Sequence, residues 1–373
     1  MSQKQFGIKK TIRDIMIEEE REKDERNNND GKKKEIKENI IIGIIKVVKN
    51  ELKQRIINSY ENAKKEDNYL EGIENEEEIK MCEIFINDKK IGFSYYYNFE
   101  NEGNYKIKYI FKNLFNSTNY MFYKCYSFIS LYLSNFNTQN VIDMNYMFYG
   151  CKSLISLDLS NFNTQNLADM TFMFFDCNSL ISLDLSNFKT QNINDMGFIF
   201  FSCNSLVSLN ISNFITQNVI HMNSIFSGCK SLISLNLSNF NTNNVIDMKC
   251  MFSGCKSLIS LNLSSFNTQN VMDMKSMFSG CNSLISLNLS NFNTQNVTDM
   301  KCMLSGCKSL ISLYLPNINT QNVIELSFMF SDCNSLISLN LSNFNAQNIT
   351  KMYYIFDGYN SLIYKNYIHN IYN

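Results

Sequence analysis

Hydrophobic and polar positions repeat along most of this chain with a period of 26 residues. One unit, CKSLISLNLSNFNTNNVIDMKCMFSG, runs from Cys229 to Gly254. The cysteine that begins each unit occurs nine times, at Cys125, Cys151, Cys177, Cys203, Cys229, Cys255, Cys281, Cys307 and Cys333. A fixed period of this length predicts a solenoid, in which each coil buries its apolar side chains against its neighbours.

The first half of a unit predicts a short strand and a turn. In the unit 151–176, Leu157 and Leu159 alternate with Asp158, so the leucines would face a core and the aspartate would face outward. The sequence NTQN follows as a turn, and its last residue, Asn166, recurs in every coil. Asparagine suits a left-handed backbone conformation there, or a side chain that bonds the backbone of the turn.

The second half of a unit predicts a short helical or 3₁₀ segment. Four apolar residues follow at the spacing i, i+3, i+4 and i+7, which is one face of a helix. In the same unit they are Met170, Met173, Phe174 and Cys177. Asp169 stands directly before them and is a candidate N-cap. Each coil is therefore expected to run strand, turn, helical segment and turn, with the strands of successive coils stacked in parallel.

The composition changes outside this array. Residues 1–38 are polar and charged and predict a disordered tail, because such a segment buries too little apolar area to offset its ordering entropy. Residues 39–114 predict a small all-β, sandwich-like domain that caps the first coil, or else a separate ligand-binding module. Its β-branched or alternating runs are 40–48, 55–60, 81–87 and 105–111. The solenoid of about nine coils is expected over 115–364, and a C-terminal tail over 365–373.

The repeat resembles that of a known family. Its leucine strand, Asn/Ser-Phe, Thr-x-Asn-Val and Asp-Met-x-x-Met-Phe-x-Gly-Cys are similar to the bacterial-surface-protein-A-like (BspA-like) leucine-rich repeat, and the likeness covers 119–362. The segment from CEIFINDKKI through NYKIKYIFKNLF is similar to the leader that precedes such repeats in some unicellular eukaryotes. The resemblance implies a leucine-rich-repeat solenoid that serves binding or adhesion, with no catalytic residues to carry over.

Charge and hydropathy narrow the classes of partner. The chain has 373 residues and a net charge of −1, so no overall field steers it toward nucleic acid or an anionic membrane. The longest apolar run, 40–48, is too short to span a bilayer, and the N-terminus has no apolar signal-peptide region. We expect a monomer in the cytoplasm, with no nucleic-acid partner and no membrane span; the alternative is the cell surface.

Residues at the same position of successive repeats form a column. Two of these columns carry residues that bind metals or form disulfides in other proteins. The cysteines recur beside core columns without a close CxxC pair, which favours buried free thiols over disulfides. An aspartate column could gather a cation, but His221 and Lys351 interrupt it and no second acidic column faces it. Its members are Asp143, Asp169, Asp195, Asp247, Asp273 and Asp299. Capping is the favoured role, and we expect no metal and no cofactor.

Two surfaces are candidates for binding a partner. The first is the concave face formed by the strands. The side chains of its outward column could bind a partner, or they could only bond one another along the stack. Its members are Tyr132, Asp158, Asp184, Asn210, Asn236, Asn262, Asn288, Tyr314 and Asn340. The second is a patch of aromatic residues outside the core columns, which residues 39–114 or the N-terminal tail, 1–38, could instead cover. Its members are Tyr146, Tyr149, Phe172, Phe175, Phe198 and Phe201.

A third candidate is an aliphatic column that we expect to lie half-buried at a corner of the coil. It contains Ile129, Ile155, Ile181, Val207 and Ile233. No phosphate-binding glycine pattern and no nucleophile–base–acid set occurs in the sequence. These observations favour a non-enzymatic scaffold for protein–protein interaction. The alternatives are a cell-surface adhesin exported without a recognisable signal peptide, and an enzyme in 39–114 regulated through the repeats.

Overall fold

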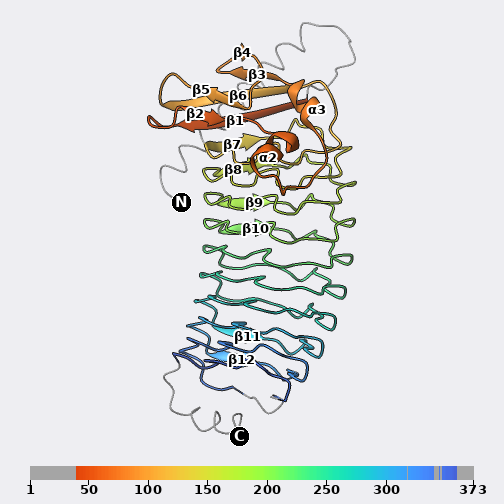
Figure 1. Ribbon diagram of the computed structural model, residues 1–373, viewed down its shortest axis with the longest axis vertical. Coiled ribbons are helices and arrows are strands. Elements are labelled where there is room, and N and C mark those ends of the chain that lie inside the picture. The colour runs from red at the N-terminus through yellow and green to blue at the C-terminus, as the bar shows by residue number, and fades with distance from the viewer. Residues whose placement is uncertain (1–38, 317, 340–343, 345–346, 359–373) are drawn as a thin grey trace. The chain divides into compact units, whose positions relative to one another are not determined.

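The computed structural model describes residues 39–316, 318–339, 344 and 347–358, which all belong to the unit Asn39–Asn373 (Figure 1). The predicted tails, 1–38 and 365–373, and the candidate residue Asn340 lie outside the described residues.

The chain first forms an antiparallel sheet. β1 (Asn39–Val47) pairs with β6 (Gly103–Phe111), which pairs with β3 (Glu83–Ile86). β3 then pairs with β4 (Lys89–Ile91) across a tight hairpin. The two turn residues of this hairpin, Asn87 and Asp88, have φ values of 45° and 65°. Asparagine and aspartate tolerate this left-handed conformation, which a two-residue hairpin of the I′ type requires.

The sheet continues directly into the repeats. β7 (Phe128–Tyr132), in the first coil, pairs antiparallel with β1 and parallel with β8 (Ser156–Asp158) of the next coil. The order β4-β3-β6-β1-β7-β8 makes one six-stranded sheet, in which β1 is an interior strand (Figure 1). Nearly every residue of β1 is buried, as the continuous apolar run at 40–45 requires of an interior strand.

Residues 39–114 also contain two short helices, so the expectation of an all-β segment is wrong. They are α2 (Tyr60–Glu66) and α3 (Glu76–Lys80). The run at 55–60, expected as a strand, leaves the sheet after β2 (Lys53–Arg55), which pairs with β5 (Tyr96–Asn98). The hydroxyl of Ser59 accepts a hydrogen bond from the Asn62 amide at 3.2 Å and so caps α2.

Each 26-residue repeat forms one coil, and successive coils stack in register (Figure 1). β9 (Ser182–Asp184) pairs in parallel with β10 (Ser208–Asn210), and β11 (Ser286–Asn288) pairs in parallel with β12 (Ser312–Tyr314). In the two coils between β10 and β11, the corresponding residues 234–236 and 260–262 form no strand.

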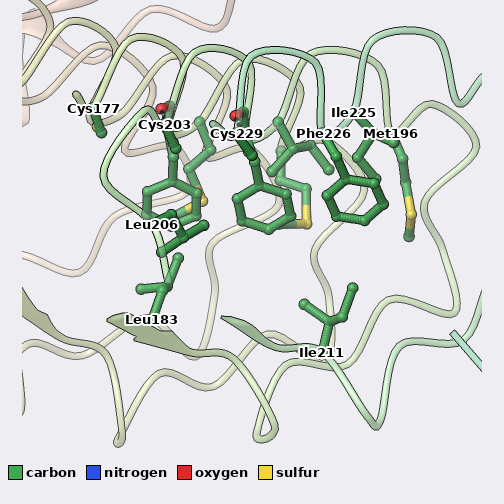
Figure 2. Close-up of a cluster of buried hydrophobic side chains, with 14 of the residues drawn as sticks. Cys177, Leu183, Met196, Cys203, Leu206, Ile211, Ile225, Phe226 and Cys229 are labelled. Atoms are coloured by element: carbon green, nitrogen blue, oxygen red, sulfur yellow. Dashed lines mark hydrogen bonds between the residues drawn. The ribbon is translucent and has the colours of Figure 1, made fainter. Parts of the chain in front are cut away.

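The core consists of ladders of identical or similar side chains. The rings of Phe174, Phe200 and Phe226 stack with centroids 5.7 and 5.8 Å apart and planes within 2° of parallel. Figure 2 shows Cys177, Cys203 and Cys229 in a row along the same direction. Leu183, in β9, and Ile211, directly after β10, close the core from the opposite side. Each coil therefore buries its apolar residues mainly against its two neighbours.

The prediction of a helical or 3₁₀ segment in each coil is wrong. In the first full coil, the Met147 amide bonds the Met144 carbonyl at 3.2 Å, and the Cys151 amide bonds the Phe148 carbonyl at 3.1 Å. The third residue of each of these turns, Tyr146 or Gly150, has a positive φ, 54° or 72°. Two consecutive type II turns therefore replace the helix.

Bonds to the next coil explain why no helix forms. The amides of Tyr146 and Phe148 donate to the carbonyls of Thr171 and Met173 in the following coil, at 3.1 and 2.9 Å. Those amides are not free for i→i−4 bonds. The Asp143 carboxylate accepts the amide two residues on, that of Asn145, at 2.8 Å. The aspartate column thus caps a turn and not a helix.

Candidate protein-binding surface

The outward column of the strand face is engaged in its own backbone. The carboxylates of Asp158 and Asp184 accept the amides two residues later, those of Ser160 and Ser186, at 3.0 and 2.9 Å. Hydrogen bonds from Ser186 lower the pKa of Asp184. The same side-chain bond to a serine amide is made by Asn210, Asn236, Asn262 and Asn288. The polar atoms of this column thus serve the end of each strand.

The two tyrosines of this column differ in exposure. Tyr132 is half-buried where β1, β7 and β8 meet, paired in register with Ile42 on one side and Asp158 on the other. Tyr314, on β12, is 57% exposed. The strand face therefore offers a partner one exposed aromatic side chain among the described members of the column.

The six residues of the predicted aromatic patch lie together in two neighbouring columns. In one column Tyr146 stacks on Phe172 with ring centroids 4.7 Å apart, and Phe172 stacks on Phe198 at 4.8 Å. In the other, Tyr149, Phe175 and Phe201 stack at 4.6 and 4.5 Å. Planes within each column are 6° to 11° from parallel. All six side chains are half-buried, and solvent reaches the parts that the stacks leave uncovered.

Both columns begin one coil earlier than the sequence pattern predicted. Tyr120 stacks on Tyr146 at 4.8 Å, and Tyr123 contacts Tyr149 at 5.1 Å. Both were missed, although each stands 26 residues before a member of the patch. Unlike the later rings, they are fully buried.

Residues from α2 and the following loop cover these first two tyrosines. Tyr60, Ala63 and Leu70 form one buried cluster with Tyr120 and Tyr123. In the first full coil, Tyr146 and Tyr149 pack against the edge of this cluster. The alternative in which residues 39–114 cover the patch therefore holds for its first part. Phe172, Phe175, Phe198 and Phe201 are not members of the cluster in the described chain.

Polar contacts fix the end of α2 on the same columns. Asp67 accepts hydrogen bonds from the Tyr123 hydroxyl at 2.8 Å and from the Lys124 ammonium at 2.6 Å. These two donors, Lys124 first, lower the pKa of the Asp67 carboxyl. The Tyr120 hydroxyl donates to the backbone carbonyl of Glu71 at 2.9 Å.

The patch ends after four coils. The next unit places Ser224 and Ser227 in the two columns, and both serines are buried. Further along, the columns hold mostly serine and cysteine until Phe328, which stacks on Tyr354 at 5.4 Å. The open aromatic surface therefore spans the coils of Phe172 and Phe198, between the α2 segment and the serine coils.

The cysteines are free thiols, as predicted, and have a structural role. Cys151 donates from Sγ to the Phe122 carbonyl of the preceding coil at 3.2 Å, and Cys229 donates to Phe200 in the same way. Burial raises the pKa of these thiols well above its usual range. Reactivity requires the thiolate, so this column is suited to packing.

The aspartate column is also occupied with local bonds. Asp143 is buried, and burial raises the pKa of its carboxyl to about 6. Across the described residues, no group of three or more His, Cys, Asp or Glu side chains is placed to hold a metal ion. Neither of the described helices is long and apolar enough to cross a membrane.

Ile155 and Ile181 in the aliphatic column are half-buried, as expected, and later members are more exposed. Val207 is 43% exposed and Ile233 is 47% exposed. Nearer the N-terminal sheet, Ile129 is buried. A shallow groove of about 810 Å³ runs along this column, lined by serines and isoleucines from 231 to 335.

These stacked coils define a repeat protein, and three stretches of it match one family model. The family is described as "Mycoplasma protein of unknown function, DUF285", and the matched residues are 93–209, 175–286 and 283–371. Together they cover more than half of the chain, and the protein belongs to this family. No curated protein matches the chain.

One solved structure that resembles the chain is titled "Crystal structure of TLR13-ssRNA13 complex". The two chains are 18% identical, and the TM-score is 0.17. The likeness covers 58% of this chain and 45% of that chain, so it spans less than half of the length of that structure.

Proposed function

We propose that this protein is a non-enzymatic scaffold that binds another protein, built as a BspA-like leucine-rich-repeat solenoid. The observation that carries the proposal is the open aromatic surface at Phe172, Phe175, Phe198 and Phe201. Contiguous apolar surface of this kind marks interaction sites, and aromatic side chains supply much of the binding energy at interfaces. Thiols and carboxylates, the groups that would otherwise suggest chemistry, are engaged in turns and core bonds.

The aromatic surface is favoured over the strand face as the binding site. Asp158 and Asp184 already accept backbone bonds, so a partner would have to replace those bonds to use the carboxylates fully. The four phenylalanine rings need no such exchange, since burying their exposed area is favourable by itself.

Two triple variants of the full chain test this assignment. Partners are first identified by proximity labelling in the native cell and then captured with each variant. Phe172→Ser, Phe175→Ser and Phe198→Ser together should abolish capture of the labelled partner. Serine fits these positions, because the chain itself carries Ser224 and Ser227 there in the next coil.

The comparison variant combines Asp158→Ala, Asp184→Ala and Tyr314→Ala and should retain the partner. The reverse result would move the site to the strand face. Retention of the partner by both variants, with both folded by circular dichroism, would refute binding through either surface.

We place the protein in the cytoplasm, as a monomer without a nucleic-acid partner. The twelve free thiols support a reducing compartment, where disulfides do not persist. The alternative, a cell-surface adhesin, predicts that protease added to intact cells digests the protein. Digestion from outside would overturn the cytoplasmic placement.

A further inference from the structure

We propose that the open aromatic surface binds one short amphipathic helix of a partner protein, which lies beside α2 and directs a lysine or arginine at its C-terminal end toward Asp176. This inference rests on the proposed function and specifies the class of partner. Three observations carry it: the way α2 already docks on the same columns, the width of the open surface, and a reversal of charge along one column.

The chain itself contains a docked helix that serves as the template. Tyr60, at the start of α2, contacts the ring of Tyr120 with centroids 5.6 Å apart. Asp67, the C-cap of α2, bonds Tyr123 and Lys124. The first residue of α2 contacts Tyr120, and its C-cap contacts Lys124. The axis of α2 therefore runs along the coil and across the two columns. Tyr60 and Ala63 supply the apolar side that faces the rings.

The open surface continues this interface without a break. Tyr146 and Tyr149 contact the α2 cluster on one side and stack on Phe172 and Phe175 on the other. In all these coils the first column has the same positive φ, 58° at Tyr120, 57° at Phe172 and 60° at Phe198. The backbone therefore presents the rings in the same way to a second helix as it does to α2.

The width of the surface fits one helix. Rings in neighbouring coils are 4.7 to 4.8 Å apart, so a move of two coils shifts the docking position by about 10 Å. Packed helices lie about 8–10 Å apart. A helix on Phe172 and Phe198 would thus contact the α2 segment on one side, and the buried serines 224 and 227 end the surface on the other.

The residue that meets the C-terminal end of the helix changes its charge from positive to negative along the array. Lys124 and Asp176 occupy the same position two coils apart, with φ values of 57° and 61°. Lys124 meets the acidic C-cap of α2. Asp176 bonds Lys152 at 3.4 Å and Asn178 at 2.9 Å and keeps part of its side chain exposed. A helix docked as α2 is docked would therefore meet a carboxylate where α2 meets an ammonium, and its cation would share Asp176 with Lys152. A cation at a helix C-terminus is also favoured by the helix dipole.

Peptides taken from this chain provide the probe. The wild-type peptide is NSYENAKKEDNYLEG, residues 58–72, and the test peptide carries Asp67→Lys. Each is labelled with a fluorophore and titrated with the full-length protein by fluorescence anisotropy. We expect the Asp67→Lys peptide to bind about threefold to fivefold more tightly, the scale of one partly exposed ion pair. With the Asp176→Lys protein, the order of the two peptides should reverse.

Two further variants separate the site from the rest of the column. Phe172→Ser with Phe198→Ser should remove binding of both peptides, and Phe328→Ser, in the same column but far along the array, should leave it unchanged. Failure of both peptides to bind the wild-type protein at millimolar concentration would refute the helix assignment, as would binding that survives the double phenylalanine variant. If the order of peptides does not reverse with Asp176→Lys, the cation assignment is wrong.

These failures are distinct from failure of the proposed function. Loss of a labelled cellular partner in the phenylalanine triple variant would still support the aromatic surface as the binding site when neither peptide binds. In that case the partner would use a structure other than a short helix.

Discussion

The Thr190 hydroxyl joins two coils through both backbone groups of Ile215. It donates to the Ile215 carbonyl at 2.9 Å and accepts from the Ile215 amide at 2.7 Å. Thr190 is completely buried. The same pair of hydrogen bonds to a residue of the next coil is made by Thr138, Thr216, Thr242, Thr268 and Thr294. At this corner of the coil the hydroxyl gives both the amide and the carbonyl of Ile215 a hydrogen-bond partner.

Replacing Thr190 with valine should destabilise the array locally. The change keeps the shape of the side chain but removes both bonds to Ile215. We expect a loss of about 1–3 kcal/mol in the free energy of unfolding, measured by denaturant titration, with faster amide exchange at 190–215. Thr190→Ser keeps the hydroxyl and should cost less. Equal stability of the two variants would show that the bridge contributes nothing.

Gly43→Ala should weaken the junction between the N-terminal sheet and the first coil. A Cβ at Gly43 would overlap the buried ring of Phe128 and lie 3.0 Å from Leu131. Overpacking of this kind costs about 1–3 kcal/mol. The expected readout is a lower melting temperature together with increased exchange of the amides of β1 and β7.

Gly92→Ala is the matched control for that change. A Cβ at Gly92 would meet no atom within 4 Å, so its melting temperature should equal that of the wild type. If Gly43→Ala melts at the same temperature as Gly92→Ala, the junction accommodates the added methyl group and the predicted overpacking against Phe128 is wrong.

Two of the twelve thiols should react first with maleimide in the native protein. Cys250 and Cys302 are half-exposed, while the other ten are buried. Burial raises the pKa of the column thiols such as Cys229 well above the usual range, so both access and thiolate formation are suppressed. Brief labelling followed by mass spectrometry should find modification at Cys250 and Cys302 alone. Labelling of Cys229 at a similar rate would contradict the packing of the core.

The stability contributed by Asp143 should decrease as the pH rises. Burial raises the pKa of its carboxyl from 3.8 to about 6, so the folded protein holds the proton more tightly than the unfolded chain does. The stabilisation is complete below pH 3.8 and is lost as the pH rises through 6. Asp143→Asn should therefore gain stability relative to the wild type progressively from pH 4 to 7, by at most roughly 2–3 kcal/mol near pH 7. The gain is reduced by any loss of the bond that the Asn119 amide donates to this carboxylate.

Asp184→Asn provides a control of opposite sign. Hydrogen bonds from Ser186 lower the pKa of Asp184, so this carboxylate stabilises the fold above the ordinary aspartate pKa and loses that effect in acid. Chemical unfolding at several pH values measures both trends. A difference between wild type and Asp143→Asn that does not change with pH would rule out the raised pKa.

The repeating pattern predicted which side chains are buried better than it predicted the backbone. Met144, Met147 and Phe148 all face the core as expected. Their spacing, however, is shared by one face of a helix and by two consecutive type II turns. The choice between the two depends on where the amide of Tyr146 donates, and it donates to Thr171 in the next coil. A bond between coils leaves no mark in the local pattern of one unit.

The sequence by itself determined the period, the inward columns and the candidate aromatic residues, because every unit repeats the same local arrangement against similar neighbours. Only the tertiary structure decided where the array begins and which rings remain open. β1 pairs with β7 although Ile44 and Ser130 are far apart in the chain, and α2 buries Tyr120 and Tyr123. These contacts join a segment outside the repeat to the first coils. The periodic pattern does not extend to that segment, so it could not predict them. They cover the first rings of each column and leave Phe172 and Phe198 half-buried, with part of each ring exposed to solvent.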